Sequence, residues 1–94
     1  MANRYPRLVI NLKHLRHNAR QVVDTCAARG ISVAGVIKGV AGMVPVAQAM
    51  ADGGCQFLAS SRMEQQAGVK AAGITTPLLM LRVPMLSEVE VWFR

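Results

Sequence analysis

Residues 32–42 read Ser-Val-Ala-Gly-Val-Ile-Lys-Gly-Val-Ala-Gly. The stretch begins as an apolar run with β-branched residues, and it ends on a single lysine, Lys38, followed by a short segment bounded by Gly39 and Gly42. A strand that is apolar on both sides is typical of a parallel sheet covered by helices, or of a barrel. The stretch therefore predicts a buried strand at residues 32–38 that delivers an amine to a loop.

Similar units recur on both sides of this strand. Strands are expected about every 20 to 25 residues with a helix between each pair, which is the spacing of right-handed βαβ units in a parallel sheet. The expected strands are residues 8–10, 32–38, 56–60 and 77–81. The expected helices are residues 12–29, 45–53 and 62–72, with a fourth beginning at 88 and running to 94.

Local signals place the ends of these helices. Asn11 is expected to cap the first helix by accepting hydrogen bonds from its free amides, and Gly30 to end it in the left-handed conformation. Ser61 with Glu64, and later Ser87 with Glu90, have the spacing of capping boxes that open the third and fourth helices. The apolar stripe expected along the first helix is Leu15, Ala19, Val22 and Cys26, widened by Val23 and Ala27.

The fold class follows from where the chemistry-bearing residues fall. A doubly wound sheet usually has a Gly-x-Gly-x-x-Gly turn after its first strand, and here Asn-Leu-Lys stands there instead. A barrel places functional residues at the carboxyl ends of its strands, where Lys38, Ser60 and Arg82 are expected. We therefore expect an α/β fold, the first half of a (β/α)8 TIM-type barrel with about four parallel strands, incomplete because such barrels need ~250 residues.

Composition narrows the class of protein further. Of 94 residues, 52% are hydrophobic and 17% charged, which predicts a single domain or part of one rather than a disordered chain. The formal charge of +6 is spread along the chain without basic runs interleaved with aromatics, which argues against nucleic acid as a partner. No apolar stretch approaches the ~20 residues of a membrane span, and the apolar run near the N-terminus is too short for a signal peptide.

The cysteines and histidines do not predict a metal site. Cys26 and Cys55 lack CxxC spacing and lie in apolar surroundings, so free thiols and a reducing, cytoplasmic compartment are expected. His14 and His17 are three residues apart on the first helix. Because Arg16 lies between them and no third ligand is close, a solvated polar face is the favoured interpretation and no metal is expected.

Three segments together resemble a known family. Pro-Arg-Leu-Val-Ile-Asn-Leu-Lys-His-Leu-Arg-His-Asn-Ala (residues 6–19), Val-Ile-Lys-Gly (36–39) and Ser-Arg-Met-Glu (61–64) resemble the N-terminal part of alanine racemase-like, fold-type III pyridoxal-phosphate enzymes. Within that family, Lys-Gly-Val-Ala-Gly looks closest to the ornithine and related basic amino-acid racemases. The resemblance covers the chain from Pro6 to about Glu90, so we interpret residues 1–94 as a partial barrel domain of this type.

The resemblance implies a function and a cofactor. It implies an isomerase of amino-acid metabolism that binds pyridoxal phosphate, acts on an amino acid as its small-molecule substrate and forms a homo-oligomer such as a dimer. By position, Lys38 would form the internal aldimine with the cofactor and act as the base on one face of the substrate. Gly39 and Arg82 are further candidates to contact the cofactor, the alternatives being a plain βα turn and a surface charge.

This sequence also departs from the resembled family. Alanine racemases proper have a tyrosine and a Gly-His-Gly element shortly after the lysine, whereas Val40, Ala41, Gly42 and Met43 stand here, so a strict alanine racemase is not expected. The family's phosphate-binding loops and opposite-face base come from later segments, so this chain alone is not expected to complete the reaction. Two other interpretations remain open, a pyridoxal-phosphate homeostasis or carrier protein of the same fold and a non-catalytic half-barrel that self-associates.

Overall fold

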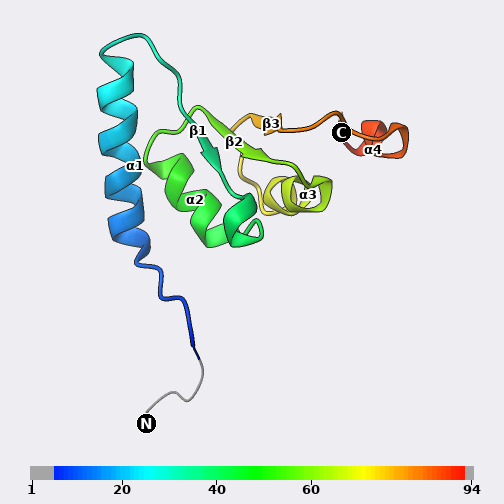
Figure 1. The fold of residues 1–94 in the computed structure, drawn as a ribbon, viewed down its shortest axis with the longest axis horizontal. Helices are drawn as coiled ribbons and strands as arrows, with labels where there is room; N and C mark the ends of the chain where they lie inside the picture. Colours follow the sequence, from blue (N-terminus) through cyan, green and yellow to red (C-terminus); the bar gives the residue numbers. More distant parts are fainter. Residues whose placement is uncertain (1–5, 93–94) are drawn as a thin grey trace.

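The computed structural model describes residues 6–92 and has an α/β architecture (Figure 1). The helices are α1 (Leu12–Ala27), α2 (Val44–Asp52), α3 (Met63–Ala71) and α4 (Leu86–Trp92), and the strands are β1 (Ala34–Val36), β2 (Phe57–Ser60) and β3 (Leu78–Met80). A short 3-10 helix, Lys38–Val40, follows β1. The helix expected over residues 88–94 thus begins two residues earlier, and its last two residues lie outside the described part.

The three strands form one parallel sheet in the order β1-β2-β3. Ala34 of β1 pairs with Phe57 of β2, and Leu58 of β2 pairs with Leu78 of β3. Helix α2 joins the first pair of strands and α3 joins the second, which is the βαβ order expected from the sequence. The sheet is not closed, which confirms the α/β class and the incomplete, barrel-like strand order. It has three strands among residues 6–92, whereas four were expected.

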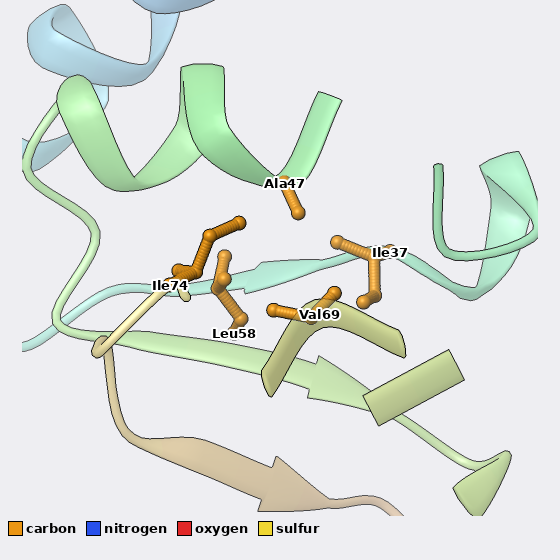
Figure 2. Close-up of a cluster of buried hydrophobic side chains, with 5 residues drawn as sticks. All are labelled: Ile37, Ala47, Leu58, Val69 and Ile74. Atoms are coloured by element: carbon orange, nitrogen blue, oxygen red, sulfur yellow. The ribbon is translucent and has the colours of Figure 1, made fainter. Parts of the chain in front are cut away.

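The hydrophobic core lies on one face of this sheet. Figure 2 shows its five fully or nearly buried side chains, contributed by the end of β1, by α2, by β2, by α3 and by the turn before β3: Ile37, Ala47, Leu58, Val69 and Ile74. Burial of apolar surface is the main favourable term in folding. Helices α2 and α3 are therefore held against the sheet by this cluster, and together they cover one of its two faces.

The opposite face of the sheet is apolar and partly exposed. Successive residues of a strand point to opposite faces, so Val36, Ala59 and Leu79, which are register partners across the three strands, lie in one row on one face. Val36 and Leu79 are 44% and 43% exposed, whereas Ala59 is buried. In a closed barrel the interior-facing residues come from such rows, so this face corresponds to a barrel interior.

Helix α1 lies beside α2 (Figure 1) and begins as the sequence predicts. The Asn11 side chain accepts a hydrogen bond from the backbone amide of His14 at 3.1 Å, which confirms the expected cap. Gly30 ends the turn after the helix with φ +71°, as expected of a glycine at this position. Val22, expected on the inner stripe, is instead 52% exposed, because α1 packs against its neighbour along a narrow strip centred on the buried Val23.

The strand expected over residues 8–10 is not formed. Leu8 and Val9 are 78% and 73% exposed, and the segment is extended without a strand partner among the described residues. The chain enters α1 directly after Asn11, and the path of that helix leads residues 6–10 away from the free edge of β1 (Figure 1). A β-branched run becomes a strand only where a neighbouring edge supplies its hydrogen bonds, and local sequence alone does not provide that edge.

The two predicted capping boxes are wrong in register. Helix α3 has Arg62, not Ser61, at its N-cap, and no side chain caps it. Glu64 binds the Arg62 guanidinium instead of a backbone amide. The Arg62 amide donates to the hydroxyl of Ser60 rather than to that of Ser61. Ser87 lies inside α4. The carboxylate that caps this helix is that of Glu88, which accepts a hydrogen bond from the Met85 amide at 2.8 Å, so the capping pair lies two residues before the predicted Ser87 and Glu90.

None of the helices in residues 6–92 has both the length and the hydropathy to cross a bilayer.

Gly53 makes the closest approach between α2 and α1, and this contact generates a prediction. A Cβ on residue 53 would lie 2.5 Å from Cβ of Ala19 and 2.8 Å from the Arg16 carbonyl oxygen. The residue has φ −72° and ψ −8°, which alanine adopts freely, so only the steric contact opposes substitution. Gly53→Ala should lower the free energy of unfolding by about 1–3 kcal/mol, the usual cost of overpacking.

The matched control is Gly68→Ala. Gly68 lies on the exposed side of α3, and a Cβ there would meet nothing within 4 Å. Because alanine is favoured over glycine inside a helix, this variant should gain roughly 0.5–1 kcal/mol. Urea unfolding followed by far-ultraviolet circular dichroism measures both values, and equal stability of the two variants would contradict the packing of α1 on α2.

Candidate functional site

Lys38 lies where the sheet ladder ends. The pairing of β1 with β2 extends one residue beyond Val36, because the Ile37 amide donates to the Ala59 carbonyl at 2.9 Å. Ile37 then adopts φ −106° and ψ −1°, which turns the chain out of the strand and into the 3-10 helix that begins at Lys38. The strand is thus shorter than the predicted 32–38, and the lysine is the second residue past the carboxyl end of β1 rather than the last residue of the strand.

The Lys38 side chain is exposed and unpaired in the described part of the chain. Among residues 6–92 it makes no ion pair and no hydrogen bond. The preceding residue, Ile37, is fully buried in the core, whereas Val36 is 44% exposed. The amine is therefore free to meet a ligand above the sheet edge.

The loop after Lys38 is tightly folded. The Ala41 amide donates to the Lys38 carbonyl at 3.2 Å and the Gly42 amide donates to the Ile37 carbonyl at 2.9 Å. Ala41 and Gly42 both have positive φ, +54° and +68°, a conformation that is costly for alanine. Gly39 has a different role, because a Cβ there would meet nothing within 4 Å, so the space beside its backbone is open to a ligand.

A buried polar network lies at the carboxyl end of β2. Ser60 is fully buried, and its hydroxyl donates to Gln65 Oε1 at 2.6 Å while accepting from the Arg62 amide at 3.1 Å. Gln66 is 1% exposed, and its side-chain amide donates to the carbonyls of Ser60 and Leu79, at 3.3 Å and 2.7 Å. Gln66 thus ties together the ends of β2 and β3, while its own Oε1 has no partner.

The sequence interpretation missed these glutamines. Gln66 occupies a position of the buried stripe of α3 between Met63 and Val69, at helical spacing. A polar residue inside an apolar stripe is the signal that could have identified it, because buried amides need hydrogen-bond partners. Gln65 has no comparable signal, since its contact with Ser60 depends on how the turn after β2 folds.

Arg82 follows β3 and is held in a dense set of hydrogen bonds. Its two terminal nitrogens donate to the two carboxylate oxygens of Glu88, each at 2.9 Å, and Nε donates to the Ser61 carbonyl at 2.6 Å. The hydrogen bonds from Arg82 and from the Met85 amide lower the pKa of Glu88, and Glu88 in turn raises the pKa of Arg82. The guanidinium therefore links the turn after β2 to the start of α4.

A second ion pair lies beside the first. Arg62 Nε donates to Glu64 at 2.7 Å, and the pKa of Glu64 is lowered by its own backbone amide and by Arg62.

Cys26 and Cys55 are free thiols, as expected, and burial raises the pKa of Cys55. Within the described part of the chain, no three His, Cys, Asp or Glu side chains gather as a metal site would require.

The structure brings three of the predicted positions to one edge. Lys38 follows β1, Ser60 ends β2 and Arg82 follows β3 after one intervening residue, and neighbouring parallel strands have their carboxyl ends on the same side. Of these three side chains, Lys38 is uncommitted, Ser60 is buried in the network with Gln65, and Arg82 is paired with Glu88. Within the described part of the chain, the edge therefore combines one exposed lysine without a hydrogen-bond partner with a polar, hydrogen-bonded support.

Comparison with known proteins identifies related sequences. Residues 10–93 match the family described as alanine racemase, N-terminal domain. The chain is 43% identical over 84 residues to a lysine racemase of Thermotoga maritima, covering 89% of this chain and 24% of the relative. It is 33% identical over 85 residues to alanine racemase 2 of Caldanaerobacter subterraneus subsp. tengcongensis, covering 87% of this chain and 22% of that protein.

An ornithine racemase of Acetoanaerobium sticklandii is 29% identical over 86 residues, which cover 92% of this chain and 24% of the relative. The chain thus spans about a quarter of the length of the curated relatives it matches. No solved structure matches it.

The pairing of Arg82 with Glu88 generates a prediction on pH dependence. Because the pKa of Glu88 is lowered in the folded chain, the pair stabilises the fold above the ordinary glutamate pKa of about 4.3, and that contribution is lost as the pH falls through the folded value. Glu88→Gln should be modestly less stable than the parent chain at neutral pH. The difference should shrink as the pH drops below about 4.

Thermal unfolding midpoints of the two chains, measured at several pH values, check this expectation. Glu64→Gln is the matched control, since Arg62 and Glu64 are both mostly exposed and such pairs contribute little. A stability difference between parent and Glu88→Gln that is the same at neutral and acid pH would show that the ion pair does not stabilise the fold.

Proposed function

Because the chain belongs to the family of the alanine racemase N-terminal domain, we propose that it is the amino-terminal part of a pyridoxal-phosphate-dependent amino-acid racemase in which Lys38 holds the cofactor. The family relationship supplies the fold, which is the first half of a TIM barrel, here present as three parallel strands that do not close. The whole reaction belongs to a polypeptide about four times as long in the matched relatives, so the activity is proposed for such a protein.

The proposal rests on two properties of Lys38, which are its position after a strand and the lack of an acidic partner among the described residues. Three lysines occur in the sequence, and Lys38 is the one that follows the carboxyl end of a strand, where barrels place their functional groups. Its amine has no acidic partner among the residues described, whereas Arg62 and Arg82 at the same edge are each paired with a glutamate. The edge therefore presents one amine able to react with a carbonyl group.

The residues present fit the cofactor in two respects. An exposed primary amine is available for attachment to the cofactor's aldehyde, and the space beside the Gly39 backbone is open to a ligand. When bound, pyridoxal phosphate supplies an electron sink for negative charge developing at the substrate Cα. Gly39 as a backbone contact and Arg82 as a contact to an anionic group remain predictions, and for Arg82 such a contact requires giving up a bond to Glu88.

The role we propose for the chain's own residues is proton transfer on one face of the substrate. The Lys38 amine would take the substrate Cα proton on that face and return it. Racemisation requires a second acid–base group on the opposite face. We place that group, and most of the phosphate contacts, in the part of the relatives' length that this chain does not match.

For the substrate we propose an amino acid with a basic side chain. The relative at 43% identity is named a lysine racemase, and another relative an ornithine racemase. The segment after the lysine, Val40 to Met43, lacks the tyrosine and Gly-His-Gly element of the alanine racemases proper. A cytoplasmic homo-oligomer remains the expected setting, and we favour the racemase over a cofactor carrier because the reported relatives are named racemases.

The proposal predicts selective attachment of pyridoxal phosphate to Lys38. Mixing the chain with pyridoxal phosphate should give a visible absorption band, and borohydride reduction followed by peptide mapping should place the cofactor on Lys38 in preference to Lys13 and Lys70. Lys38→Ala should lose the band. Lys70→Ala is the matched control, because Lys70 is also exposed, on α3, and should leave the band in place. A band of unchanged intensity in Lys38→Ala would refute the assignment.

A further inference from the structure

The loop that carries Lys38 rests on the first turn of α3 at one residue. A Cβ on residue 42 would lie 2.6 Å from Cβ, 2.8 Å from Cγ and 3.2 Å from Cα of Gln65. The side-chain stem of Gln65 therefore lies directly against the bare face of Gly42. Any residue larger than glycine at position 42 would push the loop away from the helix, and its φ of +68° also favours glycine.

The loop needs such an external contact because its own conformation is strained. Two consecutive residues, Ala41 and Gly42, have positive φ, and a non-glycine residue in that region is held there only when its surroundings fix it. Inside the loop, the Ile37 carbonyl accepts from the Val40 and Gly42 amides at 3.2 and 2.9 Å, and the Lys38 carbonyl accepts from the Ala41 amide at 3.2 Å. These bonds are local to the loop and do not join it to α3. The contact with Gln65 supplies a fixed surface against which this turn is built.

Gln65 is itself fixed from the other side. Its Oε1 accepts the hydroxyl proton of Ser60 at 2.6 Å, and that hydroxyl is oriented because it accepts from the Arg62 amide at 3.1 Å. Ser60 is fully buried at the end of β2, the strand that pairs with β1. A continuous path of contacts thus runs from the centre of the sheet through Ser60 and Gln65 to Gly42 and the Lys38 loop.

We propose that Gln65 is a positioning residue that sets where the Lys38 amine stands above the sheet edge. The inference rests on the proposed function only in so far as Lys38 is the group that reacts. Gln65 touches neither the amine nor any bound ligand in this structure, and it acts through Gly42. Ser60 is the second member of this support, because its hydroxyl holds the Gln65 amide in place.

Two variants separate this role from a general loss of stability. Gln65→Ala keeps Cβ but removes Cγ and the amide, and with them part of the surface against Gly42 and the bond to Ser60. Gln65→Glu keeps the length of the side chain and an oxygen that accepts from the Ser60 hydroxyl, so it should restore the support. Gln48→Ala is the matched control, since Gln48 is an exposed glutamine of α2 whose amide bonds only Asp52.

The first measurement is amide hydrogen exchange of the chain without cofactor. In Gln65→Ala, exchange at Ala41 and Gly42 should rise by roughly two- to tenfold, the factor that corresponds to one net hydrogen bond. Exchange in the β1–β2 ladder should be unchanged, and Gln65→Glu and Gln48→Ala should resemble the parent chain. If Gln65→Ala fails to fold, Ser60→Ala tests the same support and should give the same local increase.

The second measurement is borohydride-trapped attachment of pyridoxal phosphate, scored as the ratio of Lys38 to Lys70. Gln65→Ala should lower this ratio, and Gln65→Glu should restore it, because a change in overall stability would not favour one lysine over another. Unchanged exchange together with an unchanged ratio would overturn the positioning role while leaving Lys38 as the reactive group. A parent chain that does not label Lys38 preferentially would overturn the proposed function of Lys38, and the exchange result would still decide for or against Gln65.

Discussion

The packing of α2 and α3 against one face of a three-stranded parallel sheet is the constraint on which the rest of the structure depends. Ile37, Leu58 and Val69 bring the end of β1, the middle strand and α3 into one cluster. Because this cluster buries the last strand-paired residue before Lys38, the chain must turn outward at that point. The same cluster leaves the opposite face uncovered, so one arrangement explains both the exposed amine and the apolar row across the sheet.

Features that depend on a few neighbouring residues could be predicted from the sequence. The Asn11 cap, the left-handed Gly30, the order of helices and parallel strands and the position of Lys38 near the carboxyl end of a strand all follow from side-chain chemistry and spacing. Features that depend on distant partners could not. Residues 8–10 have strand composition but are not paired with the free edge of β1. The capping register of α3 is set by how the Ser60 hydroxyl is used after the turn.

At the carboxyl edge of the sheet, the two arginines are paired with glutamates and the lysine is not paired within the described residues. Arg62 and Arg82 each face a glutamate, and the bonds from Arg82 to Glu88 and to the Ser61 carbonyl join two loops that follow adjacent strands. Lys38 has no such partner in the described chain. Bidentate guanidinium pairs suit fixed scaffolding, whereas a lone amine on a flexible stem suits reaction with a ligand. Among the described residues, the edge thus combines two paired guanidinium groups with one unpaired lysine side chain.

The strand order has a further consequence for how the chain reaches this structure. Each strand pairs with the next one along the sequence, so Ala34 meets Phe57 and Leu58 meets Leu78 across segments of similar, modest length. The entropic cost of closing a segment depends on its length, so the two pairings cost similar amounts and neither is favoured over the other. Each strand can therefore add to the edge that its neighbour along the sequence provides, without waiting for a distant part of the chain.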